Sequence, residues 1–242
     1  MIKLINISKS YGKNKVLKNI NLEIKKGEVL ALVGESGSGK TTLSKIIIGI
    51  EKPDSGEVLF EGENIFKFDR KKLINFRKKT QYIFQDPYSS LNPRLKIGTS
   101  IKEPLLLFRN IKNKKEKVIE TMKICGLTEE FYDKFPHQLS GGQRQRAVIA
   151  RALVINPEFI IADEPVSSLD VSVQAQILNL LKNLHEKFRL TMLFITHDFS
   201  VVRFIADRIA VMKEGEIVEV ATNEKIFQNP THNYTKLLLE AI

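Results

Sequence analysis

The chain has 242 residues, of which 43% are hydrophobic, so it can bury a substantial core, and α/β chains of this length often form one domain. No apolar run approaches a bilayer span, the start lacks the features of a signal peptide, and one cysteine, Cys125, excludes an intramolecular disulfide. We therefore expect a soluble or peripheral protein in a reducing cytoplasm, with Cys125 packed in a core and a net charge of +10 that suits acidic partners or an anionic membrane.

The N-terminal part of the chain has the pattern of half-exposed antiparallel strands. Polar and apolar residues alternate over residues 1–25, and a second β-rich stretch surrounds Val58 to Phe60. Between them, the apolar run Val29 to Val33 leads into the segment GESGSGKT at residues 34–41, and a helical run follows from Thr42 to Ile50. A glycine-rich loop between a strand and a helix is the context that a P-loop requires.

The P-loop predicts a nucleotide site. Its backbone N–H groups and the helix N-terminus would face phosphate oxygens. Lys40 would reach the β and γ phosphates, Thr41 would hold Mg²⁺, and Thr42 would support the α phosphate. The other loop residues expected to contact ATP are Gly34, Ser36, Gly37 and Gly39.

Residues from about 88 to 158 change character, because strand signals fade and helical runs interrupted by prolines take over. Within this helical region, Ser140 and the two glycines that follow it are typical of an N-cap that opens a helix from Gln143 to Ile155. The free N–H groups of that helix form a second anion site, which the chain's own ATP does not need.

Two later strands end in polar residues. Phe159 to Ala162 is typical of a buried parallel strand, and it ends in Asp163 and Glu164. Asp163 suits a direct or indirect Mg²⁺ ligand and Glu164 the base that polarises the attacking water; alternatively, the pair only starts a turn. A second run, Thr191 to Thr196, ends at His197, and at this edge of an open sheet we expect His197 to donate to the γ-phosphate.

The C-terminal third predicts one more core helix and a hairpin. The turn residues Glu214 and Gly215 separate the strand-like runs Ile209 to Met212 and Ile217 to Val220. The apolar stripe that predicts the helix consists of Val173, Ile177, Leu180, Leu181, Leu184 and Phe188.

These motifs, in this order, resemble the ATP-binding cassette (ABC) ATPases over roughly residues 1 to 220. Leu139 to Gln143 is identical to the family's LSGGQ signature. The resemblance implies an α/β fold in one ABC ATPase domain, residues 1–242. A P-loop NTPase core with an antiparallel β subdomain would take up 1–87 and 159–242, and an inserted α-helical subdomain would take up about 88–158.

The family resemblance also implies roles for single residues. Tyr11 would stack on adenine, Gln85 would link Mg²⁺ and the water to the helical subdomain, Asp170 would belong to the aspartate loop, and His197 would be the switch histidine. Two cassettes would dimerise head to tail, so that each signature closes on the partner's γ-phosphate. The signature residues in that role are Ser140, Gly141, Gly142 and Gln143.

Two stretches, Gln85 to Arg94 and Asn229 to Leu238, resemble the oligopeptide, dipeptide and nickel importer subfamily. We therefore expect an ATP-hydrolysing subunit at the cytoplasmic face of the membrane that powers import of peptides or nickel-type ligands. It would act through two separate permease subunits, with a substrate-binding protein as an indirect partner. Many peptide-importer ATPases carry a longer, cysteine-bearing C-terminal extension, whereas this chain stops at Ile242, so we expect no iron–sulfur centre and leave nickel open.

The main alternative is a soluble ABC ATPase acting on nucleic acid or ribosomes, which the basic charge would suit. Its usual marks are absent: a long coiled-coil insertion, zinc cysteines or tandem cassettes. We interpret the basic clusters 70–72, 77–79 and 112–117 as solvated faces and expect no nucleic-acid partner, because no aromatic platform interleaves them. A small-molecule kinase would leave LSGGQ and His197 unused. The cargo, and whether the partner cassette is a second copy or a paralogue, stay open.

The stretch from Asp86 to Arg94 is placed to carry the nucleotide state to a docking surface. We expect Tyr88 and Leu91 to pack against a short helix of the membrane subunit, since an aromatic and an aliphatic anchor can dominate a small interface. The alternative is that both residues pack within the helical subdomain.

Overall fold

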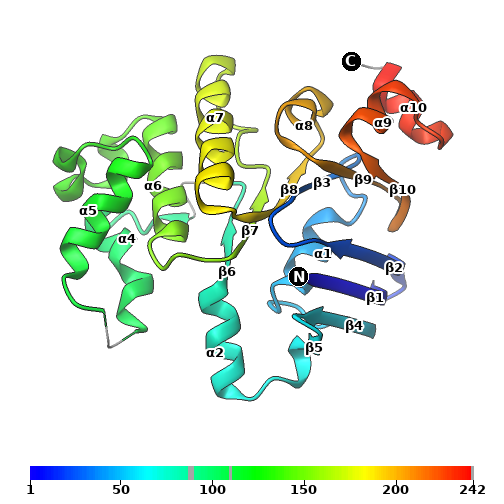
Figure 1. The fold of residues 1–242 in the computed structure, drawn as a ribbon, viewed down its shortest axis with the longest axis horizontal. Helices are drawn as coiled ribbons and strands as arrows, with labels where there is room; N and C mark the ends of the chain where they lie inside the picture. The colour runs from blue at the N-terminus through cyan, green and yellow to red at the C-terminus, as the bar shows by residue number, and fades with distance from the viewer. Residues whose placement is uncertain (87–89, 109–110, 241–242) are drawn as a thin grey trace.

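The computed structural model describes residues 1–86, 90–108 and 111–240, which form two β-sheets flanked by helices (Figure 1). The larger sheet has the strand order β10-β9-β3-β8-β7-β6, and all neighbours are parallel except the β9–β10 hairpin. Its strands are β3 (Val29–Val33), β6 (Thr80–Ile83), β7 (Phe159–Asp163), β8 (Thr191–Thr196), β9 (Arg208–Lys213) and β10 (Glu216–Thr222). The carboxyl ends of β3, β6, β7 and β8 therefore meet at one edge, where open α/β sheets bind ligands.

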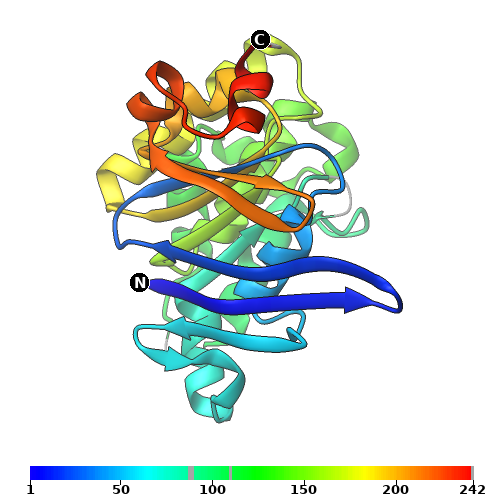
Figure 2. The ribbon, with the colours of Figure 1, turned by 90° about the vertical axis from the view of Figure 1, so that its right-hand side faces the viewer.

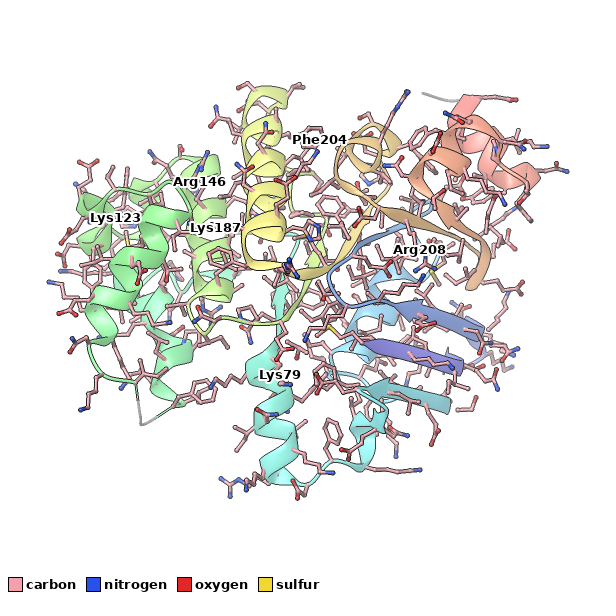
Figure 3. All side chains as sticks on the ribbon, in the orientation of Figure 1. Lys79, Lys123, Arg146, Lys187, Phe204 and Arg208 are labelled. Carbon is pink, nitrogen blue, oxygen red and sulfur yellow. The ribbon has the colours of Figure 1, made fainter. Side chains whose placement is uncertain are left out.

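The smaller sheet is antiparallel, as the alternation in the first residues predicts. Its order is β2-β1-β4-β5, and Figure 2 shows the β1–β2 hairpin between β4 and the β9–β10 hairpin. The strands are β1 (Ile2–Tyr11), β2 (Asn14–Ile24), β4 (Ser55–Phe60) and β5 (Glu63–Asn64). Arg208 in β9 joins the two sheets, since its guanidinium donates to Glu28 at 3.0 Å and to the Glu23 carbonyl of β2 at 3.4 Å (Figure 3).

Helices cover both faces of the larger sheet, and three of them gather at one side of the molecule (Figure 1). Those three are α4 (Ile97–Leu106), α5 (Lys114–Ile124) and α6 (Gly141–Leu153). The others are α1 (Lys40–Ile47), α2 (Arg70–Lys79), α7 (Val171–Phe188), α8 (Phe199–Ile205), α9 (Asn223–Gln228) and α10 (Asn233–Glu240). Short 3₁₀ turns lie at Ile65–Lys67, Glu129–Asp133 and Pro136–Gln138. None of the helices in the described ranges is long and apolar enough to cross a bilayer.

In the described part of the chain, the buried core consists of three clusters packed against the larger sheet. Strand β3 is fully buried, and its alternate side chains enter clusters on opposite faces: Leu30 packs with α1 and the smaller sheet, whereas Val33 packs with α8 and the C-terminal helices. The cluster under α4, α5 and α6 also includes Ile83 of β6 and Ile160 of β7. The helical region thus shares its core with the sheet, and its division from the rest at about residues 88 and 158 stays a prediction.

The structure confirms the two helices predicted after Ser140 and after the P-loop, but their first and last residues differ from the predicted ones. Ser140 caps α6, which starts at Gly141, two residues before the predicted Gln143, because both glycines already have helical conformation. The helix after the P-loop starts at Lys40 and ends at Ile47 instead of Ile50, where Gly49 adopts a positive φ of 73°.

Two packing predictions have different outcomes. Cys125 is buried, and burial raises the pKa of its thiol to about 12, as befits an inert core residue. The predicted apolar stripe of α7 is too long, because Phe188 at the end of the helix is 49% exposed.

Candidate active site

The P-loop lines a cavity of about 700 Å³ at the carboxyl edge of the larger sheet. The predicted residues on its wall are Gly34, Ser36, Gly37, Gly39, Lys40, Thr41, Thr42, Gln85, Glu164 and His197. The cavity thus joins the loop after β3 with the residues that follow β6, β7 and β8.

Close packing explains the glycines at both ends of the loop. A Cβ on Gly34 would lie 2.1 Å from the Met212 carbonyl oxygen of β9. A Cβ on Gly39, which has a φ of 105°, would lie 2.9 Å from side-chain carbons of both Leu17 and Met212. Larger residues would push the loop off β9, so the backbone path of the P-loop depends on these two positions.

Lys40 is folded back over the loop. Its ammonium donates to the carbonyl oxygens of Gly34 at 2.7 Å and of Glu35 at 2.8 Å. Burial lowers the pKa of Lys40, while the nearby carboxylates of Glu164 and Asp163 oppose that shift. The loop therefore holds a desolvated cation in the space that phosphates would enter.

The three predicted catalytic side chains are in contact. Gln85 Nε2 donates to Glu164 Oε2 at 2.9 Å, and His197 Nδ1 lies 3.2 Å from Glu164 Oε1. Each comes from the end of a different strand, which is why local sequence alone does not bring them together. Glu164 is the centre of this group, and its backbone has a φ of 45°, a left-handed conformation that non-glycine residues adopt rarely and often at functional sites.

Asp163 lies behind the cavity wall and is only 5% exposed. Burial raises the pKa of its carboxyl, and hydrogen bonds from the Tyr82 and Thr41 hydroxyls oppose that shift. Among the described ranges, no three His, Cys, Asp or Glu side chains form a metal cluster. Mg²⁺ needs none, because it usually binds one or two protein oxygens together with substrate phosphates, and the Thr41 and Asp163 oxygens suit that chemistry.

Tyr11 does not line the cavity. Its hydroxyl donates to Glu51, its ring lies 5.5 Å from the Lys9 ammonium, and the residue is 48% exposed. Val16 lies on the cavity wall instead. Stacking of Tyr11 on adenine stays a prediction.

Four wall residues were missed by sequence reasoning: Val16, Glu35, Phe199 and Leu238. Glu35 is within the motif and could have been named. Leu238 comes from α10, far along the chain, and neighbouring Tyr234 accepts a hydrogen bond from the Glu35 backbone N–H at 3.4 Å. No local signal shows that a C-terminal helix returns to the P-loop.

The signature residues Ser140 to Gln143 do not line this cavity, and neither does Asp170. Ser140 Oγ accepts from Gln143 N at 3.3 Å, and Gln143 Oε1 accepts from Ser140 N at 2.9 Å, a reciprocal capping box. Asp170 caps α7 by accepting from Val173 N at 2.9 Å, and this bond lowers the pKa of Asp170. Within the described residues, these groups do not reach the chain's own nucleotide site.

The docking prediction for Leu91 is wrong. Leu91 is 1% exposed and belongs to the core shared by the helical region and the sheet, so it cannot anchor a partner. Tyr88 lies outside the described residues.

Comparison with known proteins identifies the family of the chain. The model of the family described as ABC transporter matches residues 17–167. The chain is 51% identical over 235 residues to the oligopeptide transport ATP-binding protein OppF of Bacillus subtilis (strain 168), covering 96% of this chain and 77% of that protein. It is 48% identical over 229 residues to the dipeptide transport ATP-binding protein DppF of Haemophilus influenzae, covering 94% of this chain and 70% of that protein.

A solved structure has the same fold. It is the dimeric post-hydrolysis state of the ATP-binding cassette MJ0796 bound to ADP and Pi, which matches with a TM-score of 0.83 and 37% identity over 92% of this chain and 99% of that chain. The predicted fold class, a P-loop NTPase core with an antiparallel sheet and an inserted helical part, is thereby confirmed. The P-loop cavity, the Gln85–Glu164–His197 contacts and these matches together place the chain in the ABC transporter family, as one of its ATP-binding, ATP-hydrolysing members.

Proposed function

We propose that this chain hydrolyses ATP to power peptide import through separate membrane permease subunits. The observation that carries the proposal is the contact of Gln85 and His197 with Glu164 on the wall of the P-loop cavity. The names of the OppF and DppF relatives support peptides as the cargo and give no support to an ATPase of nucleic acid or ribosomes. Nickel-type ligands remain the second cargo to test, since the subfamily resemblance includes them.

The roles of the residues follow from what phosphoryl transfer requires, which is positioning and electrostatic stabilisation. Glu164 polarises the attacking water, and its two neighbours hold its carboxylate in place and sense the γ-phosphate. Lys40 and the loop N–H groups hold the phosphates. Bound Mg²⁺ supplies charge neutralisation at the β and γ phosphates, and Thr41, Asp163 and Gln85 are the residues that would hold it.

The active unit is a head-to-tail pair of cassettes. Ser140 to Gln143 would form an anion site at the start of α6, and they do not line the chain's own cavity. In the pair, this site meets the partner's γ-phosphate, with Asp170 at the same interface. The dimeric relative MJ0796 supports a pair, and the partner is either a second copy or a paralogue.

The permease would dock on exposed apolar residues at the end of α4, which replace the buried Leu91 as the proposed anchors. Leu106 and Leu107 are 59% and 78% exposed there. The Lys78 ammonium of α2 lies 5.4 Å from the Phe108 ring, so this surface extends to α2. We assign this surface to a short helix of a membrane subunit, which would hold the chain at the cytoplasmic face, with a substrate-binding protein as an indirect partner.

The test is transport in the cell that encodes the chain, with its own copy replaced by Glu164→Gln. We expect loss of labelled oligopeptide uptake, while uptake of an amino acid by an unrelated carrier is unchanged. Retained peptide uptake would contradict the proposal. Loss of nickel uptake with normal peptide uptake would reassign the cargo to nickel.

A further inference from the structure

Tyr82 connects strand β6 to the carboxylate that ends β7. The two strands are parallel, and Tyr82 is the register partner of Ile161, two residues before Asp163. Side chains two residues apart share one face of a strand, so Ile161 and Asp163 point to the same side. That side is covered by α1, which carries Thr41 and Ser44.

A chain of hydroxyls links these residues. Tyr82 Oη donates to Asp163 Oδ2 at 2.6 Å and lies 2.8 Å from Ser44 Oγ, which is 2.9 Å from the Thr41 carbonyl oxygen. An ionised carboxylate only accepts hydrogen bonds, so the phenol proton goes to Asp163. The Tyr82 oxygen can then only accept from Ser44, whose single hydroxyl proton goes either to Tyr82 or to the Thr41 carbonyl oxygen.

The Asp163 carboxylate and the Ser44 hydroxyl are shielded from alternative partners in solvent. Asp163 is 5% exposed and Ser44 is fully buried. The remaining donor to the carboxylate is the Thr41 hydroxyl. Removing the Tyr82 hydroxyl would leave a buried carboxylate oxygen without its donor, and the carboxylate would be free to rotate.

We propose that Tyr82 is a positioning residue of the nucleotide site: it fixes the Asp163 carboxylate in one orientation beside Thr41, where Mg²⁺ accompanies ATP. This inference rests on the proposed role of Asp163 towards Mg²⁺. Tyr82 does not line the P-loop cavity, and it acts only through Asp163. Partners that orient metal-binding groups in this way commonly change metal affinity or activity by about 10- to 100-fold when removed.

The test is Tyr82→Phe in the full chain, because phenylalanine keeps the ring and its contact with Phe84, 4.3 Å between centroids. Binding of a fluorescent ATP analogue is measured in EDTA and then over a Mg²⁺ titration. We expect unchanged affinity in EDTA and a rise of about 10-fold or more in the Mg²⁺ concentration that gives half of the Mg²⁺-dependent binding change. Ser44→Ala should also raise this half-maximal Mg²⁺ concentration, but by a smaller factor, since the Tyr82–Asp163 hydrogen bond remains.

Tyr132→Phe is the matched control, since this ring lies 5.3 Å from the Lys115 ammonium in the helical region, and it should change nothing. An unchanged Mg²⁺ dependence in Tyr82→Phe would overturn the positioning role, as would an equal loss of affinity with and without Mg²⁺, which a merely structural role gives. If the wild-type chain itself shows no Mg²⁺-dependent binding or hydrolysis, the proposed function fails first. The two failures are thus distinguishable.

Discussion

Glu164 combines a left-handed backbone with side-chain contacts to the Gln85 amide and the His197 ring, as a positioned base requires. Glu164→Gln keeps the size and removes the charge at the reacting water. ATP binding should be retained, while the turnover number falls by about 10²–10⁴-fold, the usual contribution of a general base. Steady-state hydrolysis and nucleotide binding of the purified variant measure both quantities, and accumulation of an ATP-bound dimer should accompany the loss. Hydrolysis near the wild-type rate would remove Glu164 from this role.

Leu91 and Leu107 form a matched pair for the docking surface. Leu91 is buried, so Leu91→Ala should lower the free energy of unfolding by about 2–5 kcal/mol, as large-to-small core changes do. Leu107 is 78% exposed, so Leu107→Ser should leave urea unfolding and ATP affinity unchanged while weakening copurification with membrane subunits. Normal assembly of the Leu107 variant would place the docking surface elsewhere.

At this scale the sequence predicted which polar side chains share one cavity better than it predicted the packing of apolar ones. Gln85, Glu164 and His197 follow strands, and motif and order alone indicated that they belong to one site. Leu91 was misjudged because an aliphatic residue in a polar stretch looks the same whether it faces solvent or core. Leu238 was missed because only tertiary packing returns α10 to the P-loop.

Helix α10 is tied to the sheet by Glu219 of β10. This carboxylate is 7% exposed and accepts from Thr231 N at 2.8 Å, Thr231 Oγ1 at 2.7 Å and His232 N at 3.1 Å, just before the helix. Burial would raise the pKa of Glu219, but the donors of residues 231–235 outweigh it and hold the pKa at about 2, below the ordinary 4.5. The folded-state pKa is depressed, so the ionised group stabilises the fold above about pH 4.5, and this contribution is lost as the pH falls towards 2.

Glu219→Gln should therefore lower the free energy of unfolding at neutral pH by about 1.5–3 kcal/mol, the range for hydrogen bonds to charged groups. The difference in free energy of unfolding between the variant and the wild type should decrease as the pH falls from about 4.5 towards 2. Urea unfolding at a series of pH values measures this difference. Glu216→Gln on the same strand is the control, because that side chain is exposed and only meets Lys18 at 3.9 Å. A difference in free energy of unfolding that is constant with pH would show that the charge of Glu219 does not hold α10 against the sheet.

Elements with strong local signals were predictable, and their ends were not. Ser140 was predicted as the N-cap of α6, but the helix begins at Gly141 and not at the predicted Gln143. The end of α7 is harder, because Phe188 continues the apolar spacing although the helix has already passed beyond the core. Periodicity reports which face a helix buries, not how far the neighbouring structure extends along it.

For the whole molecule, the strand order β10-β9-β3-β8-β7-β6 could not be derived from local patterns, since it pairs residues as far apart in the chain as Leu30 and Arg208. The family resemblance predicted the fold class and did not give this order. The same order gathers the predicted catalytic residues at one edge, while the signature at the start of α6 lies outside the cavity. In the proposed head-to-tail pair, each chain would therefore supply two half-sites that face different nucleotides.

Ser140 is the position at which this claim is best tested. Aspartate caps helices as well as serine does, so Ser140→Asp keeps α6 capped while adding a negative charge towards the partner's γ-phosphate. Ser140→Asn is the neutral control with the same capping ability. Gly142 is unsuited, because a Cβ there would lie 2.6 Å from Val173 Cγ1 of the same chain. We expect Ser140→Asp to bind ATP as a monomer and to lose hydrolysis, and Ser140→Asn to retain more of it.

The decisive measurement is ATP hydrolysis by a mixture of Ser140→Asp and Lys40→Ala chains, each inactive alone. If signatures act across the interface, a mixed dimer has one site with both lesions and one intact site, so the mixture should recover activity. If each signature served its own chain's nucleotide, both sites of the mixed dimer would carry a lesion. Absence of recovery, with mixed dimers demonstrated by differently tagged chains, would contradict the account.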